Sequence, residues 1–121
     1  MLFIFSLLIL FQLKHFIADY PLQGAYMLGK FKGHGWVAPL SAHCGVHAFF
    51  TLCISLALVS WEYAIALAYF DFVVHFIMDR VKASPRLLGR YAPTESKFWY
   101  ALGFDQMVHH LTHYAIVAIL I

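Results

Sequence analysis

The sequence predicts an all-α protein, an integral membrane bundle of four transmembrane helices that run up, down, up and down. Of its 121 residues, 63% are hydrophobic and 12% are charged, and the mean hydropathy is +0.76. Soluble domains average about 45–50% apolar residues, and a soluble domain of this length has too much surface to hide the excess. The chain also contains four apolar stretches, each near the roughly 20 residues that cross a bilayer.

The four stretches cover about residues 2–20, 38–60, 61–80 and 98–121 of a single domain, 1–121. The second and third are so close together that they predict an antiparallel hairpin, with Trp61 and Tyr63 at the headgroup level. No basic residue precedes the first stretch, whereas a signal peptide has a basic start and a small-residue cleavage site. We therefore expect a retained first helix.

The two longer loops predict segments that lie at the membrane surface. Residues 21–39 begin and end with proline and contain four glycines, which favour loop structure. Residues 81–97 combine two prolines with leucines and arginines, a composition typical of a short interfacial segment.

The basic residues predict the orientation. All of them lie in or beside the two longer loops: Lys14, Lys30, Lys32, Arg80, Lys82, Arg86, Arg90 and Lys97. Lys14 is expected to snorkel from its helix to the surface. The positive-inside rule makes this side cytoplasmic, so both termini would face the periplasm of a bacterial inner membrane. Membrane lipid is the expected partner, a homo-oligomer stays open, and no basic-aromatic run indicates nucleic-acid binding.

Each predicted helix carries two ionisable residues spaced i, i+4. The pairs are His15 with Asp19, His43 with His47, His75 with Asp79, and Asp105 with His109. At this spacing, Cβ atoms lie about 5–6 Å apart on one helix face, as in helical H-E-x-x-H metal sites. All four pairs lie toward the ends of their helices that would face the cytoplasm.

The depths of the pairs agree only approximately. At about 1.5 Å per residue, Asp19 and Asp79 come out roughly 15 Å shallower than His109. The four pairs would lie at more similar depths if the first helix continued through a kink at Pro21 and the third helix continued past Arg80.

An ionisable group in the hydrocarbon region costs about 2.5–3.5 kcal/mol on insertion scales. A bound cation would compensate several such groups at once, because carboxylates and neutral imidazoles are natural metal ligands. We therefore expect the eight paired residues to hold one or two divalent ions, zinc first, with iron or manganese as alternatives. Ligand pairs on facing helices resemble helical di-metal sites in general form. The plainer interpretation is that each residue bonds a neighbouring helix as structural glue.

Several other polar residues could either bind the metal or support its ligands. They are Asp71, His113, His110 and Gln23. Asp71 and His113 continue the ligand faces of their helices, whereas His110 points elsewhere. Gln23 and Gln106 are expected to support the site.

Residues 15–23, His-Phe-Ile-Ala-Asp-Tyr-Pro-Leu-Gln, resemble the H-F-x-x-D-x-x-x-Q motif that opens a family of small bacterial and phage membrane proteins, domain of unknown function 3307. The resemblance continues through His43 and His47, residues 75–79 with Lys82, and residues 105–109. It implies a multi-helix membrane fold and no established activity. The chain is also distantly similar to inner-membrane metal-dependent hydrolases, which implies hydrolysis.

The site residues favour a metal-dependent membrane hydrolase. A metal ion would activate water, and Asp71 or Asp105 would act as the catalytic general base. Basic residues beside the site, among them Arg80 and Arg86, would attract an anionic lipid or another phosphate-containing substrate. The same basic residues would serve equally well to set the orientation of the protein in the membrane. The reaction would be phosphoester or amide hydrolysis near the bilayer surface.

Two other functional classes stay open. A membrane di-iron oxidase or hydroxylase would use a similar histidine cluster, but no histidine lies three residues before the adjacent His109 and His110. A non-enzymatic metal-binding or structural subunit is the second alternative. Metal transport is less favoured, because the second helix offers only Thr51 and Ser55 beyond its histidines.

Overall fold

Four α-helices and no strands make up the computed structural model, which describes all 121 residues. The helices are α1 (Leu2–Asp19), α2 (Val37–Leu56), α3 (Trp61–Ala83) and α4 (Ser96–Leu120). The two longer loops contain the short 3-10 helices η1 (Met27–Phe31) and η2 (Leu88–Arg90). The predicted all-α class is confirmed.

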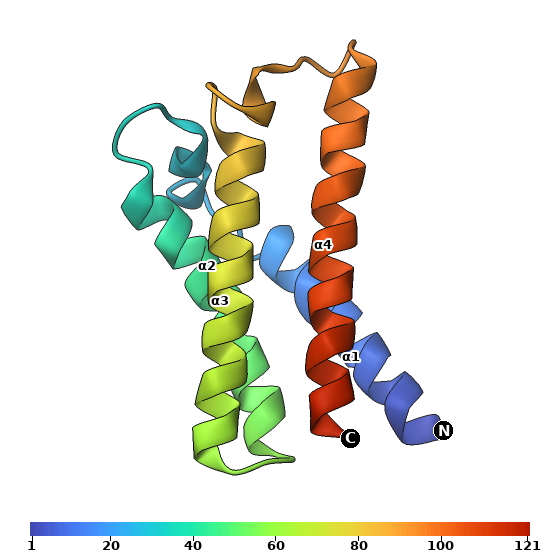
Figure 1. The fold of residues 1–121 in the computed structure, drawn as a ribbon. Helices are drawn as coiled ribbons and strands as arrows, with labels where there is room; N and C mark the ends of the chain where they lie inside the picture. Colours follow the sequence, from blue (N-terminus) through green and yellow to red (C-terminus); the bar gives the residue numbers. More distant parts are fainter.

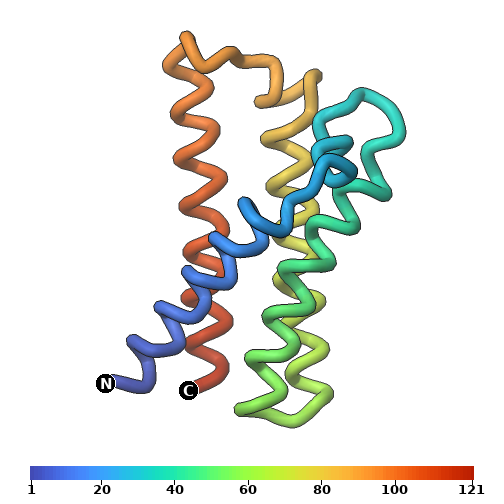
Figure 2. The backbone as a smooth tube through the Cα atoms, turned by 180° about the vertical axis from the view of Figure 1, so that it is seen from behind, coloured from blue at the N-terminus to red at the C-terminus, as the bar shows by residue number.

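Successive helices run in opposite directions, so both termini and the α2–α3 turn lie at one end and the two longer loops at the other (Figure 1). Seen from behind, α1 crosses the other helices obliquely (Figure 2). The helices α2 and α3 form a hairpin, and α4 packs against α3 and α1. This arrangement brings the loop-side ends of all four helices together.

The ends of the helices differ from the prediction at functionally important places. The helix α3 continues three residues past Arg80, to Ala83, and Ser84 adopts an extended backbone before Pro85, as a residue before proline prefers. The first helix ends within one residue of its predicted end, and the continuation through Pro21 that would improve the convergence of the pairs does not occur. The helix ends at Asp19, and a hydrogen bond from Leu22 N to Ile17 O (3.0 Å) turns the chain instead.

Polar and charged side chains fill much of the interior. Of the 31 buried residues, 15 are polar or charged, whereas soluble proteins rarely bury such residues. The buried apolar side chains include one packed cluster near the termini, formed by Leu7, Phe11, Leu67, Ile116, Val117 and Leu120. The buried polar residues therefore lie mainly between this cluster and the two longer loops.

Two helices, α1 and α2, are long and apolar enough to cross a membrane. The helices α3 and α4 do not qualify on average hydropathy and charge. Length and composition thus support two candidate spans rather than the four that the sequence predicted.

The loop after α3 folds back tightly onto the end of that helix. Gly89 donates its N–H to Ser84 O at 3.0 Å. A Cβ atom at Gly89 would lie 2.5 Å from Ala83 O, closer than real Cβ contacts allow. The absence of a side chain here lets η2 pack against α3.

We expect Gly89→Ala to destabilise the protein by about 1–3 kcal/mol, the usual cost of overpacking. The thermal midpoint of unfolding of the purified protein in detergent measures this effect. Gly33→Ala is the matched control, because nothing lies within 4 Å of a Cβ at Gly33. Equal midpoints for the two variants would contradict the tight packing of η2.

Candidate metal centre

The eight residues predicted as metal ligands lie in one connected cluster. His47 Nε2 lies 2.9 Å from Asp19 Oδ1 and links α2 to α1. His43 Nε2 lies 3.0 Å from Asp79 Oδ2 and links α2 to α3. His109 Nε2 lies 3.1 Å from Asp79 Oδ1 and links α4 to α3. The longer α3 allows this convergence, because it carries Asp79 within a regular helix.

The imidazole of His75 lies in the middle of the cluster. Its ring centroid is 4.0 Å from the ring centroids of both His47 and His109. His75 Nδ1 lies 3.1 Å from Asp71 O, the backbone carbonyl one turn earlier, and also 3.1 Å from Asp71 Oδ1. His75 Nε2 is buried without a hydrogen-bond partner. A histidine that is oriented by a backbone carbonyl through its other ring nitrogen is common beside metal sites.

In each of three groups of side chains, the ligand atoms lie within 4.8 Å of one another. They are His15 with Asp19 and His47, Asp79 with Asp105 and His109, and His15 with His75 and His113. Their charge environments differ, and this difference determines which group suits a cation.

The group around Asp19 combines two imidazoles with one carboxylate. His15 Nε2 lies 3.0 Å from Asp19 Oδ2, and His47 Nε2 lies 2.9 Å from Asp19 Oδ1. Neighbouring ligand atoms of a tetrahedral zinc ion are about 3.3 Å apart when the metal–ligand distance is about 2.0–2.1 Å. His43 Nε2 lies 3.4 Å from Asp19 Oδ1 and offers a further donor. The donor types and their spacing fit zinc.

The group of Asp79, Asp105 and His109 already contains two cations. Lys30 Nζ lies 3.2 Å from Asp79 Oδ2, and Lys82 Nζ lies 2.7 Å from Asp105 Oδ2. A metal ion would have to share these carboxylates with ammonium groups, which repel it.

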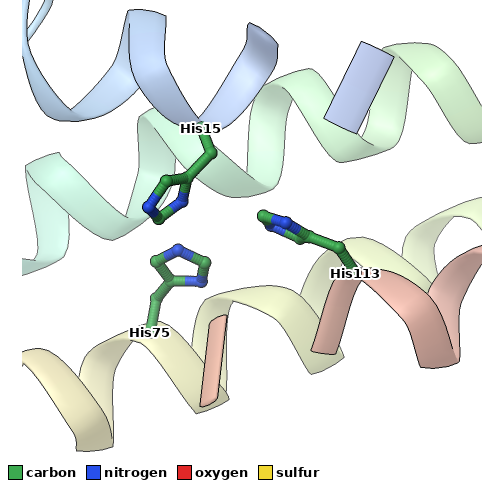
Figure 3. Close-up of side chains that lie close together, drawn as sticks. All are labelled: His15, His75 and His113. Carbon is green, nitrogen blue, oxygen red and sulfur yellow. The ribbon is translucent and has the colours of Figure 1, made fainter. Parts of the chain in front are cut away.

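The third group contains only histidines. The rings of His15, His75 and His113 come from three helices and face a common space (Figure 3). Lys14 Nζ lies 3.5 Å from His113 Nε2 and 2.6 Å from Asp71 Oδ2. A cation placed among these three rings would therefore be close to an ammonium group.

The charges of the cluster single out Asp19. Each of the three buried or half-buried lysines contacts a different carboxylate, on Asp71, Asp79 and Asp105. Asp19 contacts only histidines. With neutral histidines, the cluster has one uncompensated negative charge, located at Asp19.

Asp19 also lies at the opening of the cluster. Its side chain is 21% exposed, whereas the side chains of His43 and His47 are almost fully buried. A pocket of about 110 Å³ adjoins it, and the lining includes Gln23, Lys30, Lys82 and Gln106. A ligand that enters from the loop end would reach Asp19 first.

A family profile described as "Protein of unknown function (DUF3307)" matches residues 7–121. The chain belongs to this family. No curated protein and no solved structure matches it. The match confirms the first resemblance seen in the sequence. The matched range includes every residue of the histidine and aspartate cluster. It assigns no activity, so hydrolysis stays a proposal.

Three lysines of this DUF3307 protein have roles that were not predicted from the sequence. Lys14 was expected to snorkel, and this prediction is wrong, because Lys14 is only 3% exposed. The buried residues of α1 include Leu7, Phe11 and Ala18. Lys14 lies on the same helical face, and this spacing could have placed it inside. Nothing local in the sequence indicates that Lys30 and Lys82 reach Asp79 and Asp105.

The other open residues have different surroundings. His113 is fully buried, whereas His110 is half-buried with its ring centroid 6.0 Å from that of His15. Gln106 Oε1 lies 3.2 Å from His15 Nε2, and Gln106 Nε2 donates to Asp105 Oδ2 at 3.0 Å. Gln106 thus connects the Asp19 group to Asp105.

The two predicted catalytic aspartates are both fully buried. Asp71 Oδ2 accepts hydrogen bonds from Lys14 (2.6 Å) and Thr51 (2.5 Å) on its far side from the pocket. Asp105 contacts Lys82 and Gln106, which line the pocket. Of the two, Asp105 is therefore better placed to act on a bound molecule.

We expect Lys14→Met to destabilise the protein by about 3–5 kcal/mol, because it leaves Asp71 buried without its cation. Thermal unfolding in detergent measures the loss. Lys32→Met, at an exposed lysine of the first long loop, is the control. The double variant Lys14→Met/Asp71→Asn should recover part of the loss, and no recovery would argue against a direct charge pairing.

Proposed function

We propose that this protein is an integral membrane, metal-dependent hydrolase with its site in the cytoplasmic half of a four-helix bundle. The observation that carries the proposal is the position of Asp19. It is the one carboxylate of the cluster without a lysine partner, and it lies between His15 and His47 at the opening of the site.

The distribution of apolar side chains supports a bundle with all four helices in lipid. The helices that fail on average hydropathy expose large apolar residues, for example Ile65 and Ile77 on α3 and Leu111 and Ile119 on α4. Their charged residues Asp71, Asp79 and Asp105 are buried instead. The mean hydropathy of a helix does not show that its apolar side chains face outward while its charged side chains face inward. In the apolar segments of α1 and α2, only 28% and 33% of residues are buried, unlike an enclosed core helix.

The interior supports access from one end only. The apolar cluster of Leu7, Phe11, Leu67, Ile116, Val117 and Leu120 occupies the end near the termini. The pocket beside Asp19 opens among residues of the first long loop and of the adjoining parts of α1, α3 and α4. This arrangement favours a reaction site over a transport path.

The ligands that we assign to one divalent ion are His15, Asp19 and His47, with His43 as a further donor. Zinc fits two imidazoles and one carboxylate best; iron and manganese remain alternatives. Bound there, the ion would supply Lewis acidity and an activated water at neutral pH. A second ion at Asp79 and Asp105 is disfavoured by Lys30 and Lys82.

The other residues of the site have distinct roles in this proposal. Lys82 and Gln106 present donors at the pocket and can bind an anionic or carbonyl oxygen of the substrate. Asp105, held by both, is our candidate for the group that accepts a proton. Asp71 acts as a positioning residue: its backbone carbonyl orients His75 Nδ1, and its carboxylate pairs with Lys14.

One observation favours a non-enzymatic alternative. The three Lys–Asp pairs each join separate elements: α1 to α3, η1 to α3, and α3 to α4. A structural subunit would need such links without any metal. The di-iron alternative is less well supported, because it needs the second ion that the lysines oppose.

We expect the purified wild-type protein to contain about one zinc ion per chain by mass spectrometric metal analysis. His47→Ala and Asp19→Asn should each weaken zinc binding by more than the roughly 10–100-fold typical of losing a supporting group. His34→Ala, in the exposed part of the first long loop, is the control and should keep its metal.

Zinc should also raise the thermal midpoint of the wild type but not that of Asp19→Asn. A folded wild type that takes up no stoichiometric metal would contradict both the hydrolase and the di-iron hypotheses. That result would favour the alternative that the protein is a non-enzymatic structural subunit.

The orientation can be tested with fusion reporters. We expect alkaline phosphatase to be active when it is fused after Ile121 and inactive when it is fused after Arg90, because basic loops stay in the cytoplasm. A fluorescent reporter that folds only in the cytoplasm should give the opposite pattern. Activity of alkaline phosphatase after Arg90 would contradict the proposed topology.

A further inference from the structure

We propose that the site takes an amphiphilic phosphoester, whose phosphate lies at the pocket beside Asp19 and whose hydrocarbon chain fills an adjoining apolar pocket. This inference rests on the proposed hydrolase function and names its substrate class. It is carried by two pockets of opposite character that share part of their walls.

The apolar pocket lies between the loop-side ends of α3 and α4. Its volume is about 380 Å³, within the roughly 300–1,000 Å³ typical of small-molecule sites. Leu88, Tyr91, Phe98 and Ala101 form much of its wall, and no acidic residue lines it. These side chains suit a hydrocarbon chain.

The apolar pocket adjoins the polar pocket at Asp19. Both are lined by Phe31, Lys82 and Leu102. Lys82 Nζ contacts Asp105 at 2.7 Å, and the Lys82 side chain remains 22% exposed. A molecule that spans both pockets would therefore place its junction between head and chain next to an ammonium group.

The charges around the two pockets favour an anionic head over a neutral one. Lys30, Lys82 and Gln106 line the polar pocket and can donate to phosphate oxygens. At the outer rim, Arg90 and Lys97 lie over the ring of Tyr91, at 5.0 and 5.4 Å from its centroid. Four acidic side chains lie nearby. Asp19 is assigned to the metal, Asp79 and Asp105 are paired with Lys30 and Lys82, and Glu95 accepts a hydrogen bond from Ala92 N. The zinc ion and the two rim cations therefore supply the net positive charge for an anionic head.

The reaction would be hydrolysis and needs only water as co-reactant. The water oxygen forms a new bond to phosphorus, and the bond from phosphorus to the leaving oxygen breaks. One proton of the water stays on the phosphate product, and the other passes through Asp105 to the leaving oxygen.

The test compares 4-nitrophenyl methyl phosphate with 4-nitrophenyl octyl phosphate on the zinc-loaded full-length protein in a maltoside detergent. We expect kcat/KM to be at least about tenfold higher for the octyl ester, because each buried methylene contributes roughly a fourfold preference. Ala101→Phe, which fills the apolar pocket, should reduce this ratio to about that of micelle partitioning alone. Ala66→Phe, on the exposed face of α3, is the matched control and should keep the wild-type ratio.

Phe98→Ala keeps the inference testable if Ala101→Phe does not fold. It removes part of the pocket wall and should also lower the octyl preference, whereas Phe70→Ala at an exposed position should not. A second readout needs no catalysis: octyl phosphate should raise the thermal midpoint of the wild type more than methyl phosphate does. Ala101→Phe should lose this difference.

The outcomes separate this inference from the proposed function. Failure of the folded wild type to take up any stoichiometric metal ion would overturn the proposed function. Bound zinc without hydrolysis of either ester would overturn the phosphoester assignment and leave an amide as the next substrate to test. Equal octyl-to-methyl ratios for the wild type, Ala101→Phe and Ala66→Phe would overturn the apolar pocket as the chain site.

Discussion

The pairing of buried lysines with buried carboxylates is the constraint on which the rest of this structure depends. Charges in a low-dielectric interior are costly unless they are paired. Lys14, Lys30 and Lys82 each pair with a different aspartate and join α1, η1 and α4 to α3. These pairs hold the helix ends together and also leave Asp19 as the carboxylate without an ammonium partner.

The same pairing makes three chemically similar groups of ligands unequal. Judged by distance alone, each of the three groups could hold an ion. Judged by charge, two of them have a lysine at or beside them, and the group around Asp19 has none in contact. Since Asp19 also lies beside the polar pocket, the group best suited to a cation is the one that a substrate can reach.

Much of the fold and of the candidate site could be predicted from the sequence, because both depend on helical periodicity. The i, i+4 spacing placed His15 with Asp19 and His75 with Asp79 on common helix faces, and the structure puts all eight predicted ligands in one cluster. The end of α1 at Asp19 lies within one residue of the predicted end, whereas α3 extends three residues beyond its predicted end, to Ala83. Both helices end two residues before a proline, Pro21 or Pro85.

The sequence by itself determined that the protein is helical, that each helix carries a pair of ionisable residues one turn apart, and that its basic residues gather at one end. Only the tertiary structure decided which lysine meets which aspartate, because those contacts join residues up to 57 positions apart. It also decided that an apolar pocket adjoins the polar one. Local periodicity determines the face of a helix on which a residue lies, but only packing determines what that face meets.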